Sequence, residues 1–453
     1  MLSVGHQDGR KHGTPTVMRR SVKSAASALL AFTFANGVLP PTAWAQEADA
    51  SQPRIVEIRL VGNDKTRDKV ILRELALAPG DVADPVAIED GRQAVQDLGL
   101  FRQVEATTHP VPGGVALELK MREKYFLLPI PRLDASSDRD VSYGAQLRWD
   151  NVWGLNHRLD ITAEKGDFPE ERDRRKETSV QLSYRAPYIF DSPYELRTRL
   201  EWIDRETPVI DPLTNEVTDD TFDETFEQVE VIATRDLRTG RPRDGWIVGG
   251  GLFWKRQDVS GEFAPPPDGQ AIALVGTATF DDLRYHIYSD TGRRFSARIE
   301  AAGEGLGSDY DYTRTTVNYF QSNALGDTPH QTLHVLGSAG VLTGGPGSRN
   351  EFSLGGSGRM RGYDSDFLEG DRYYYGSVEY LRPIKWNWLR LLAFVEVGGS
   401  GDDREGLRDD SPYADVGLGV RIRLTWFVNI EIELGWAYPL RGGEGANFFA
   451  GGN

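Results

Sequence analysis

The sequence predicts a mainly β fold: a 16-stranded transmembrane antiparallel β-barrel that follows one small α+β domain with the element order βααββ. Three observations predict this fold class. From Tyr125 onward, apolar and polar residues alternate with a period of two, in segments that recur about every twenty residues, as in barrel strands. Roughly sixteen such segments occur, and an even number closes an antiparallel barrel without an unpaired edge. After residue 45, no apolar run approaches the ~20 residues that a membrane helix needs.

The composition argues against a nucleic-acid-binding protein and against any site that depends on cysteine. The chain has 453 residues, a formal net charge of −16 and no cysteine. This acidity argues against nucleic acid as a partner, because phosphate binding needs clustered Lys and Arg. The lack of cysteine excludes disulfides, thiolate metal sites, cysteine nucleophiles and a lipoprotein anchor.

Residues 1–45 have the pattern of a signal peptide. The pattern consists of a basic region, an apolar stretch and a small-x-small cleavage site: Arg19, Arg20 and Lys23; residues 25–39; and Ala43-Trp44-Ala45. We expect the mature chain to begin at Gln46 and to be exported. Met18 would start a signal peptide of ordinary length, so the sequence leaves the true start codon open.

Residues 54–123 are predicted to form the small α+β domain. Alternating residues indicate strands, whereas cap residues and glycines mark the ends of helices. The expected elements are a strand through Val56, Ile58 and Leu60, a helix capped by Thr66, a helix capped by Asp84 with Pro85 at its first position and Gly99 after it, and a last strand through Val115, Leu117, Leu119 and Met121.

Residues 125–453 are predicted to form the barrel. In one segment the apolar residues Tyr143, Leu147 and Trp149 share a face, while Arg148 and Asp150 lie on the other. A soluble sandwich would show the same local alternation, but the number of segments and the aromatic residues near strand ends favour a membrane barrel. Strand centres are expected near residues 130, 145, 160, 182, 198, 228, 250, 275, 298, 316, 336, 378, 393, 419, 433 and 449.

Connections are expected to be short at one end of the barrel and long at the other. Asn151–Asn156 is a short connection, and a long loop is predicted over Glu206–Asp220. The predicted loop Asp211–Glu227 is acidic enough to suggest calcium, but its spacing does not resemble a known calcium site, which favours a solvated surface loop.

Two adjacent strands carry charges on the face opposite their apolar residues. Val416, Leu418 and Val420 should face lipid, so Arg421 and Arg423 should point into the lumen. On the next strand Glu431 and Glu433 should do the same. A turn centred near Phe427 places Arg423 opposite Glu431 and Arg421 opposite Glu433, which predicts structural, lumenal ion pairs.

The stretch from Phe352 to Tyr363 is too rich in glycine for a strand, yet it lies between predicted barrel strands. Its Arg361-Gly362-Tyr363 tip combines a planar cation, a residue that permits close backbone approach, and an aromatic ring. One interpretation is a loop folded into the barrel, where Arg361 needs a carboxylate partner. The alternative is an exposed turn with an incidental arginine.

Residues 54–123 resemble a polypeptide-transport-associated (POTRA) domain, the periplasmic module of the BamA/TamA family of outer-membrane assembly factors. The resemblance rests on Ile58, Gly62-Asn63, Pro79-Gly80-Asp81, Leu98-Gly99, Phe101, Val104 and the closing Val115–Arg122 strand. Members of this family usually carry several POTRA domains, and only one is found here, which leaves the branch of the family open.

The resemblance extends to the barrel and implies a lock between its loop and its wall. In this family a loop, here 343–370, folds back into the barrel with an Arg-Gly-aromatic tip that matches Arg361, Gly362 and Tyr363. The resemblance implies that Arg361 pairs with Glu396, which stands where the family's Phe-x-Asp-x-Gly strand motif has Asp. The matching strand-motif residues are Phe394, Gly398, Glu379 and Tyr380.

The resemblance further implies a location and an activity. It places the barrel in the outer membrane of a Gram-negative bacterium and the POTRA domain in the periplasm. The implied activity is insertion or export of unfolded or extended client proteins through a lateral seam between the first and last strands, with periplasmic or inner-membrane accessory proteins as further partners. The alternatives are a two-partner secretion translocator, and a passive porin or surface antigen without insertase activity.

No catalytic residue, metal ligand set or cofactor site is identified. Gly355-Gly356-Ser357-Gly358-Arg359 fails the Gly-x-Ser-x-Gly pattern of a serine nucleophile because Arg359 replaces the last glycine. The histidines show neither metal-ligand spacing nor a nucleophile partner. We therefore do not expect an enzyme, although residues of a phospholipase or protease scattered over strands would leave no motif.

Overall fold

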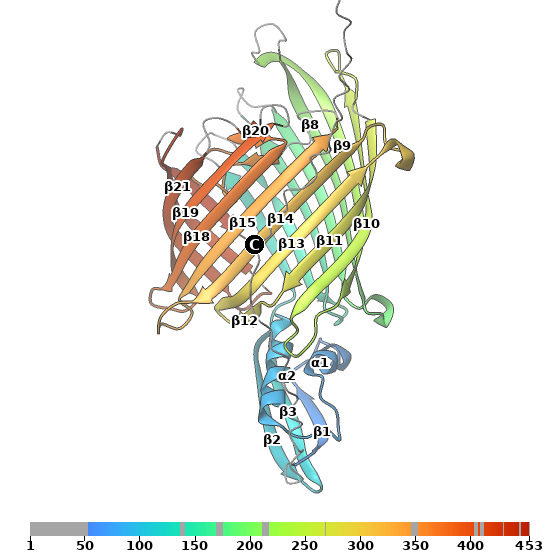
Figure 1. Cartoon of the computed structure of the whole chain (residues 1–453), viewed down its shortest axis with the longest axis vertical. Coiled ribbons are helices and arrows are strands. Elements are labelled where there is room, and N and C mark those ends of the chain that lie inside the picture. The colour runs from blue at the N-terminus through green and yellow to red at the C-terminus, as the bar shows by residue number, and fades with distance from the viewer. Residues whose placement is uncertain are drawn as a thin grey trace, which may run out of the picture. The chain divides into compact units, whose positions relative to one another are not determined.

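The computed structural model describes residues 53–135, 141–168, 175–210, 217–267, 269–345, 352–402, 406–407, 412–428, 430–443 and 445–452. The predicted signal peptide, residues 1–45, lies outside the described residues. Figure 1 shows long strands curled into a barrel, and a small sheet packed against two helices.

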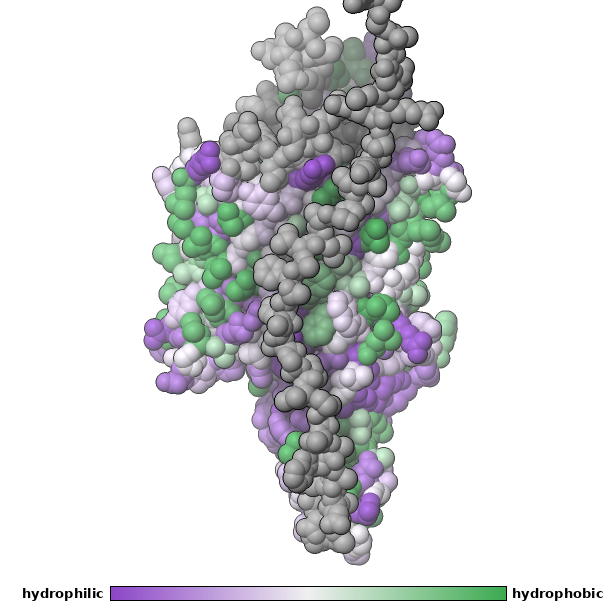
Figure 2. Space-filling view, in the orientation of Figure 1, coloured by the Kyte–Doolittle hydropathy of each residue, from purple (hydrophilic) through white to green (hydrophobic). Residues whose placement is uncertain are grey.

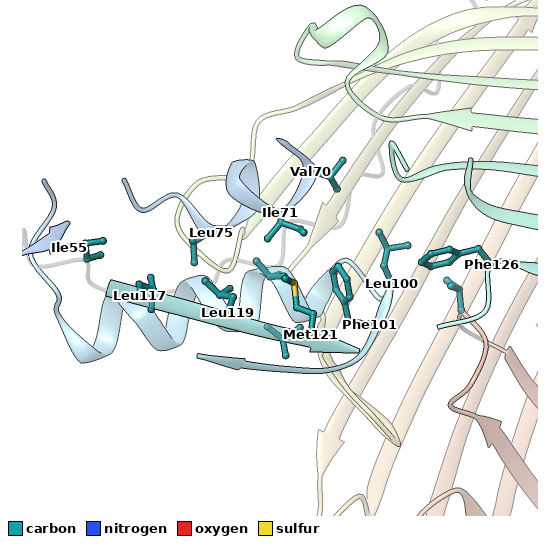
Figure 3. Packing of buried hydrophobic residues seen from close by; sticks show 13 residues of the cluster. Ile55, Val70, Ile71, Leu75, Leu100, Phe101, Leu117, Leu119, Met121 and Phe126 are labelled. Carbon is teal, nitrogen blue, oxygen red and sulfur yellow. The ribbon is translucent and has the colours of Figure 1, made fainter. Parts of the chain in front are cut away.

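The N-terminal part has the predicted βααββ order: β1 (Ile55–Val61), α1 (Asp68–Leu75), α2 (Pro85–Asp97), β2 (Phe101–Val111) and β3 (Gly114–Glu123). The strand order is β1-β3-β2, with β1 parallel and β2 antiparallel to β3. Apolar side chains from both helices and all three strands form one buried core (Figure 3): Ile55, Val70, Ile71, Leu75, Leu100, Phe101, Leu117, Leu119 and Met121 among others.

The cap predicted for the second helix is present, whereas the cap predicted for the first is wrong. The Asp84 side chain accepts hydrogen bonds from two backbone N–H groups in the first turn of α2. Thr66 instead precedes the N-cap residue Arg67, and its hydroxyl donates to Glu123 Oε1 (2.6 Å) and accepts from Asn151 Nδ2 (2.8 Å). These long-range hydrogen bonds satisfy the buried hydroxyl and replace the local cap.

The rest of the described chain is almost entirely strands. The long strands, which match the expected centres, are β4 (Leu127–Ala135), β5 (Val141–Val152), β6 (His157–Asp167), β7 (Lys176–Ala186), β8 (Tyr194–Ile210), β9 (Val217–Asp236), β10 (Gly245–Ser260), β11 (Gly269–Asp281), β13 (Ser289–Ala302), β14 (Tyr312–Ala324), β15 (Thr332–Gly344), β18 (Arg372–Pro383), β19 (Leu389–Asp402), β21 (Tyr413–Leu424), β22 (Ile430–Pro439) and β23 (Asn447–Gly452). The short elements are β12 (Arg284–His286), β16 (Phe352–Leu354), β17 (Leu368–Gly370), β20 (Gly406–Leu407), and the 3₁₀ turns η1 (Ile189–Asp191) and η2 (Glu304–Leu306).

The two faces of the barrel sheet differ as predicted. On β5, Tyr143 and Leu147 are 48% and 43% exposed, whereas Arg148 and Asp150 are 2% and 5% exposed. Figure 2 shows hydrophobic residues gathered over the middle of the barrel strands on the visible face, with hydrophilic residues toward the strand ends. This outward apolar band is the surface that a barrel presents to lipid. The predicted fold class is therefore confirmed.

One seam of the barrel differs from the others. The strand order brings β23 next to β4 and completes the ring. Each of the other neighbouring pairs of long strands is an antiparallel ladder with a continuous or once-shifted register. The seam between β23 and β4 joins the last strand to the first, and β23, with six residues, is the shortest of the long strands.

The long loop predicted over Glu206–Asp220 is wrong in extent. β8 continues to Ile210, and β9 begins at Val217. With 17 and 20 residues, these strands exceed the roughly 9–11 residues that cross a bilayer. In the first part of β9 the outward face carries Asp219, Thr221 and Asp223 in place of apolar residues, so this part of the sequence resembles a loop, although Phe222, Glu224 and Phe226 on the other face are buried.

No helix among the described residues is long and apolar enough to cross a membrane.

Asp97, at the end of α2, predicts a pH-dependent stability. Its carboxylate accepts hydrogen bonds from Gln93 Nε2 (2.8 Å) and from the backbone N of Tyr285 in β12 (2.9 Å). Burial raises the pKa of Asp97 from 3.8 to about 6. The folded chain thus binds this proton more tightly than the unfolded chain, and the free energy of unfolding falls as pH rises from about 4 to about 6.

Asp97→Asn removes this charge and keeps the acceptor oxygen. We expect the variant to lose this group's pH dependence and to be more stable than wild type above pH 6, by about 2 kcal/mol. Thermal unfolding of both proteins between pH 4 and pH 8 measures the difference. A variant that is less stable than wild type at pH 7 would show that the ionised carboxylate stabilises the fold.

Candidate functional site

The loop between β15 and β18 folds into the barrel. Its two short strands, β16 and β17, pair with each other, and their apolar residues pack in a buried cluster with Tyr373, Tyr375 and Tyr413. At the tip, Met360, Arg361 and Tyr363 are 0%, 4% and 2% exposed. The alternative of an exposed turn is therefore wrong, and the glycine-rich stretch is a buried structural element.

The conformation of the tip depends on glycine. Gly355 has a φ of +133°, and a Cβ atom at this position would lie 2.0 Å from the carbonyl oxygen of Asp364. The chain then turns back on itself, because Gly356 N donates to Tyr363 O (3.0 Å) and Tyr363 N donates to Met360 O (3.0 Å). A side chain at 355 would prevent this close approach of backbone to backbone. The turn directs Arg361 toward the barrel wall.

Arg361 contacts three carboxylates from three different strands. Its Nη2 donates to Glu379 Oε1 on β18 (2.7 Å) and to Glu396 Oε1 on β19 (3.0 Å), and its Nη1 donates to Glu433 Oε2 on β22 (3.1 Å). The backbone N of Arg361 also donates to Glu396 Oε2 (2.7 Å). The planar guanidinium fork can serve several acceptors at once, which a lysine cannot do in this geometry.

The same carboxylates also bind an arginine of the barrel wall. Arg421 Nη2, on β21, lies 2.6 Å from Glu379 Oε2 and 2.5 Å from Glu433 Oε1. Two guanidinium groups, one from the loop and one from the wall, therefore share two carboxylates. Removing either cation would leave buried acids with less compensation, so the network ties the loop to the wall.

The lumenal ion pairs continue along the two strands in the expected register. Arg421 lies opposite Glu433 and Arg423 lies opposite Glu431. Arg423 Nε is 2.5 Å from Glu431 Oε1, and its Nη2 is 2.6 Å from Asp290 Oδ2 on β13. These four residues do point into the lumen, where they link β21 to β22, and Arg423 also links them to β13.

The residues of the Phe-x-Glu-x-Gly segment each contact the loop tip. The Cζ atom of Arg361 lies 3.6 Å from the centroid of the Phe394 ring, a cation–π contact. Glu396, two residues later, binds the same guanidinium. A Cβ atom at Gly398 would lie 3.0 Å from Met360 Sδ, so the glycine makes room for that side chain.

Gly362 and Tyr363 bind a second part of the wall. A Cβ atom at Gly362 would lie 2.6 Å from Asp415 Cβ and 3.1 Å from Pro439 N, so only glycine fits between β21 and β22. The hydroxyl of Tyr363 lies 2.9 Å from Ala414 O and 2.7 Å from Arg441 O. Tyr380, by contrast, follows Glu379 on β18 and therefore lies on the opposite, outward face, so it does not join the site.

Sequence reasoning missed three features of the site. The pairings of Arg361 with Glu379 and Glu433 join the loop to strands other than β19. Tyr375 donates through its hydroxyl to Glu396 Oε1 (2.5 Å). Asp415 is 0% exposed and lies directly opposite Glu396 on the neighbouring strand. Asp415 could have been placed from its parity, since it shares a face with Arg421 and Arg423.

The arrangement is suited to holding a loop rather than to bond chemistry. Its groups are cations, carboxylates and aromatic rings that bind one another. Within the described ranges, no group of three or more His, Cys, Asp or Glu residues has an arrangement that could hold a metal ion. The site therefore fixes one conformation of the loop and of the strands that it contacts.

Comparison with known families matches both parts of the chain. Residues 151–452 match the Omp85 superfamily domain, and residues 53–124 match the POTRA family, described as the surface antigen variable number repeat.

Known proteins with a similar sequence or structure include three of interest. The outer membrane protein assembly factor BamA of Neorickettsia risticii (strain Illinois) is 30% identical over 76% of this chain and 47% of its own length. The chloroplastic protein TOC75 of Pisum sativum is 23% identical over 89% of this chain and 56% of its own length. The solved structure of CdiB from Escherichia coli has a TM-score of 0.62 at 12% identity, and the match covers 89% of this chain and 77% of that one. The chain thus spans about half the length of these two curated relatives.

Proposed function

The chain belongs to the Omp85 superfamily, and we propose that it inserts or exports client proteins at the outer membrane by opening the seam between β4 and β23. The similar protein from Neorickettsia risticii is named an outer-membrane assembly factor, which supports this class of activity. The proposed partners are outer-membrane lipid, extended client proteins, and periplasmic or inner-membrane accessory proteins. The proposal includes no bond-making step.

The proposal is supported by a loop tip that buried ion pairs hold beside the seam where the short last strand meets the first. The last strand, β23, has six residues and forms six residue pairs with β22. The loop tip is fixed by buried ion pairs to β18, β19 and β22. A barrel that only conducts solutes needs a closed wall, whereas a barrel that releases clients sideways needs a seam that opens and a device that sets its resting state.

The three-stranded sheet offers a way to receive a client. Its order β1-β3-β2 leaves β2 with one free edge. An extended polypeptide can add to such an edge through backbone hydrogen bonds, which recognise strands of almost any sequence. We propose that β2 (Phe101–Val111) binds clients in this way before they reach the barrel.

Two alternatives make different predictions. The structural similarity to CdiB, at 12% identity, shows a shared fold and leaves a dedicated secretion translocator as the second candidate. A passive porin is the third. An insertase should accelerate folding of many outer-membrane barrel clients into lipid vesicles, a secretion translocator should move one soluble client across the bilayer, and a porin should do neither.

The decisive assay compares client folding with single-channel conductance for the same purified protein. We expect faster folding of a small barrel client in vesicles that contain the protein than in empty vesicles. Steady, large conductance without acceleration of folding would overturn the proposal and favour the porin.

A further inference from the structure

The last strand, β23, contacts the in-folded loop along its inward face. Asn447 Nδ2, at the start of β23, donates to the carbonyl oxygen of Gly362 (3.0 Å) and to Asp364 Oδ1 (3.3 Å). Both acceptors belong to the loop tip, next to Arg361. The side-chain amide of Asn447 on β23 therefore binds the backbone of the loop tip, residues 360–364.

Two residues further along β23, Phe449 packs beside Arg361 of the loop tip and Phe394 of β19. Its side chain is 2% exposed, its ring centroid lies 5.5 Å from that of Phe394, and the Cζ atom of Arg361 lies 5.3 Å from it. Gly435 on β22 makes this position possible, because a Cβ atom there would lie 2.6 Å from Phe449 Cζ. The ring thus packs against the aromatic group that supports the Arg361 guanidinium.

The same face of β23 reaches the loop a third time at Gly451. A Cβ atom at Gly451 would lie 3.8 Å from the carbonyl oxygen of Ser357. Asn447, Phe449 and Gly451 alternate along the strand, so all three point to one face. The loop therefore lies along the inner side of β23 from its first residue to the end of its described part.

Support for β23 from neighbouring strands is weaker. Its ladder to β22 has six residue pairs, from Ala437↔Asn447 to Ile432↔Gly452, and glycine occurs in three of them. On its other side β23 neighbours β4, the first strand of the barrel. Glycine contributes no cross-strand side-chain contact, which leaves this edge of the barrel poorly fixed by the sheet alone.

We propose that the in-folded loop is the internal brace of the seam strand, and that Asn447 and Phe449 are the positioning residues that couple Arg361 to β23. While Arg361 stays with its carboxylates, β23 is held from inside. Release of the loop tip frees β23 to move away from β4. The coupling deepens the proposed function, because it names what controls the seam, but it concerns the strand's own stability and holds whether or not clients pass there.

Hydrogen–deuterium exchange of the purified full chain in lipid nanodiscs tests the brace without reference to activity. The variant Asn447→Ala loses both hydrogen bonds to the loop. We expect amide exchange in residues 447–452 to increase about thirtyfold over wild type, because two hydrogen bonds worth about 1 kcal/mol each are lost. Exchange in β9 and β10, which are far from β23 in the strand order, should not change.

Asn318→Ala is the matched control. Asn318 lies on β14, where its Oδ1 accepts from Ser338 Oγ of the neighbouring strand (2.8 Å), so the substitution also removes a lumenal hydrogen bond but none to β23. It should leave exchange in 447–452 at the wild-type rate. If Asn447→Ala does not fold, Asn447→Asp serves instead, because it keeps the shape and loses the donor, and it should increase exchange at least as much.

A second variant, Arg361→Gln, also tests whether the loop braces β23. Arg361→Gln should also increase exchange in 447–452, because it releases the loop tip that β23 contacts. Wild-type exchange in 447–452 for both the Asn447 variant and Arg361→Gln would overturn the brace, and an equal increase in Asn318→Ala would show that the effect is a general loosening of the barrel.

Discussion

Arg361→Ala is expected to abolish most of the client-folding activity while leaving the protein folded in the membrane. The substitution removes the cation that contacts Glu379, Glu396 and Glu433, and uncompensated buried charges cost about 3–5 kcal/mol. The loop tip would leave its site, but the ladders of the wall would remain. Client folding in vesicles and the amount of folded protein in the membrane fraction measure the two effects separately.

Two further variants sharpen this prediction. Arg361→Lys keeps the charge but not the fork, so it should retain only part of the activity. Arg359→Ala is the control within the same loop, because the Arg359 guanidinium donates to Tyr373 Oη at 3.3 Å and does not reach the three carboxylates. If the Arg359 and Arg361 variants lost client-folding activity equally, the ion pairs of Arg361 with the three carboxylates would not explain the loss.

Gly362→Ala is expected to displace the loop by steric clash alone, without changing any charge. The added methyl group would lie 2.6 Å from Asp415 Cβ and 3.1 Å from Pro439 N, closer than atoms pack, and overpacking of this kind costs about 1–3 kcal/mol. We expect limited proteolysis to cleave the loop faster than in wild type, and client folding to become slower.

Gly358→Ala provides the matched control for this clash. A Cβ atom at Gly358 would meet no atom within 4 Å, although the residue lies in the same loop. It should behave like wild type in both assays. If the loop of Gly362→Ala resisted proteolysis as in wild type and client folding were unchanged, the barrel strands would have moved to make room for the methyl group, and the prediction would be wrong.

Much of the barrel could be predicted because a strand in a membrane has two chemically different environments. Alternation fixed which residues of β21 and β22 face the lumen, and one turn position then fixed Arg423 opposite Glu431. The same rule failed for the first part of β9, because its outward face is polar and the apolar–polar alternation is lost.

The site could be predicted only in part, for a geometric reason. Periodicity gives the face on which a residue lies, but not which strands come together across a curved wall. The pairing of Arg361 with Glu396 came from a family resemblance, whereas its contacts with Glu379 and Glu433 depend on the curvature of the barrel. In the same way Thr66 resembles a helix cap locally, and only the fold brings Asn151 to its hydroxyl.

In the proposed function, client proteins pass through the seam between β4 and β23. Because the natural chain has no cysteine, introduced pairs react without competition. A cysteine pair at facing positions of β4 and β23 would lock the seam by a disulfide, and a pair at Ala145 and Ala163, which are opposite each other on β5 and β6, would lock a ladder that need not open. We expect the seam lock to stop client folding and a reductant to restore it, while the control lock has no effect. Full activity in the seam-locked barrel would contradict the claim.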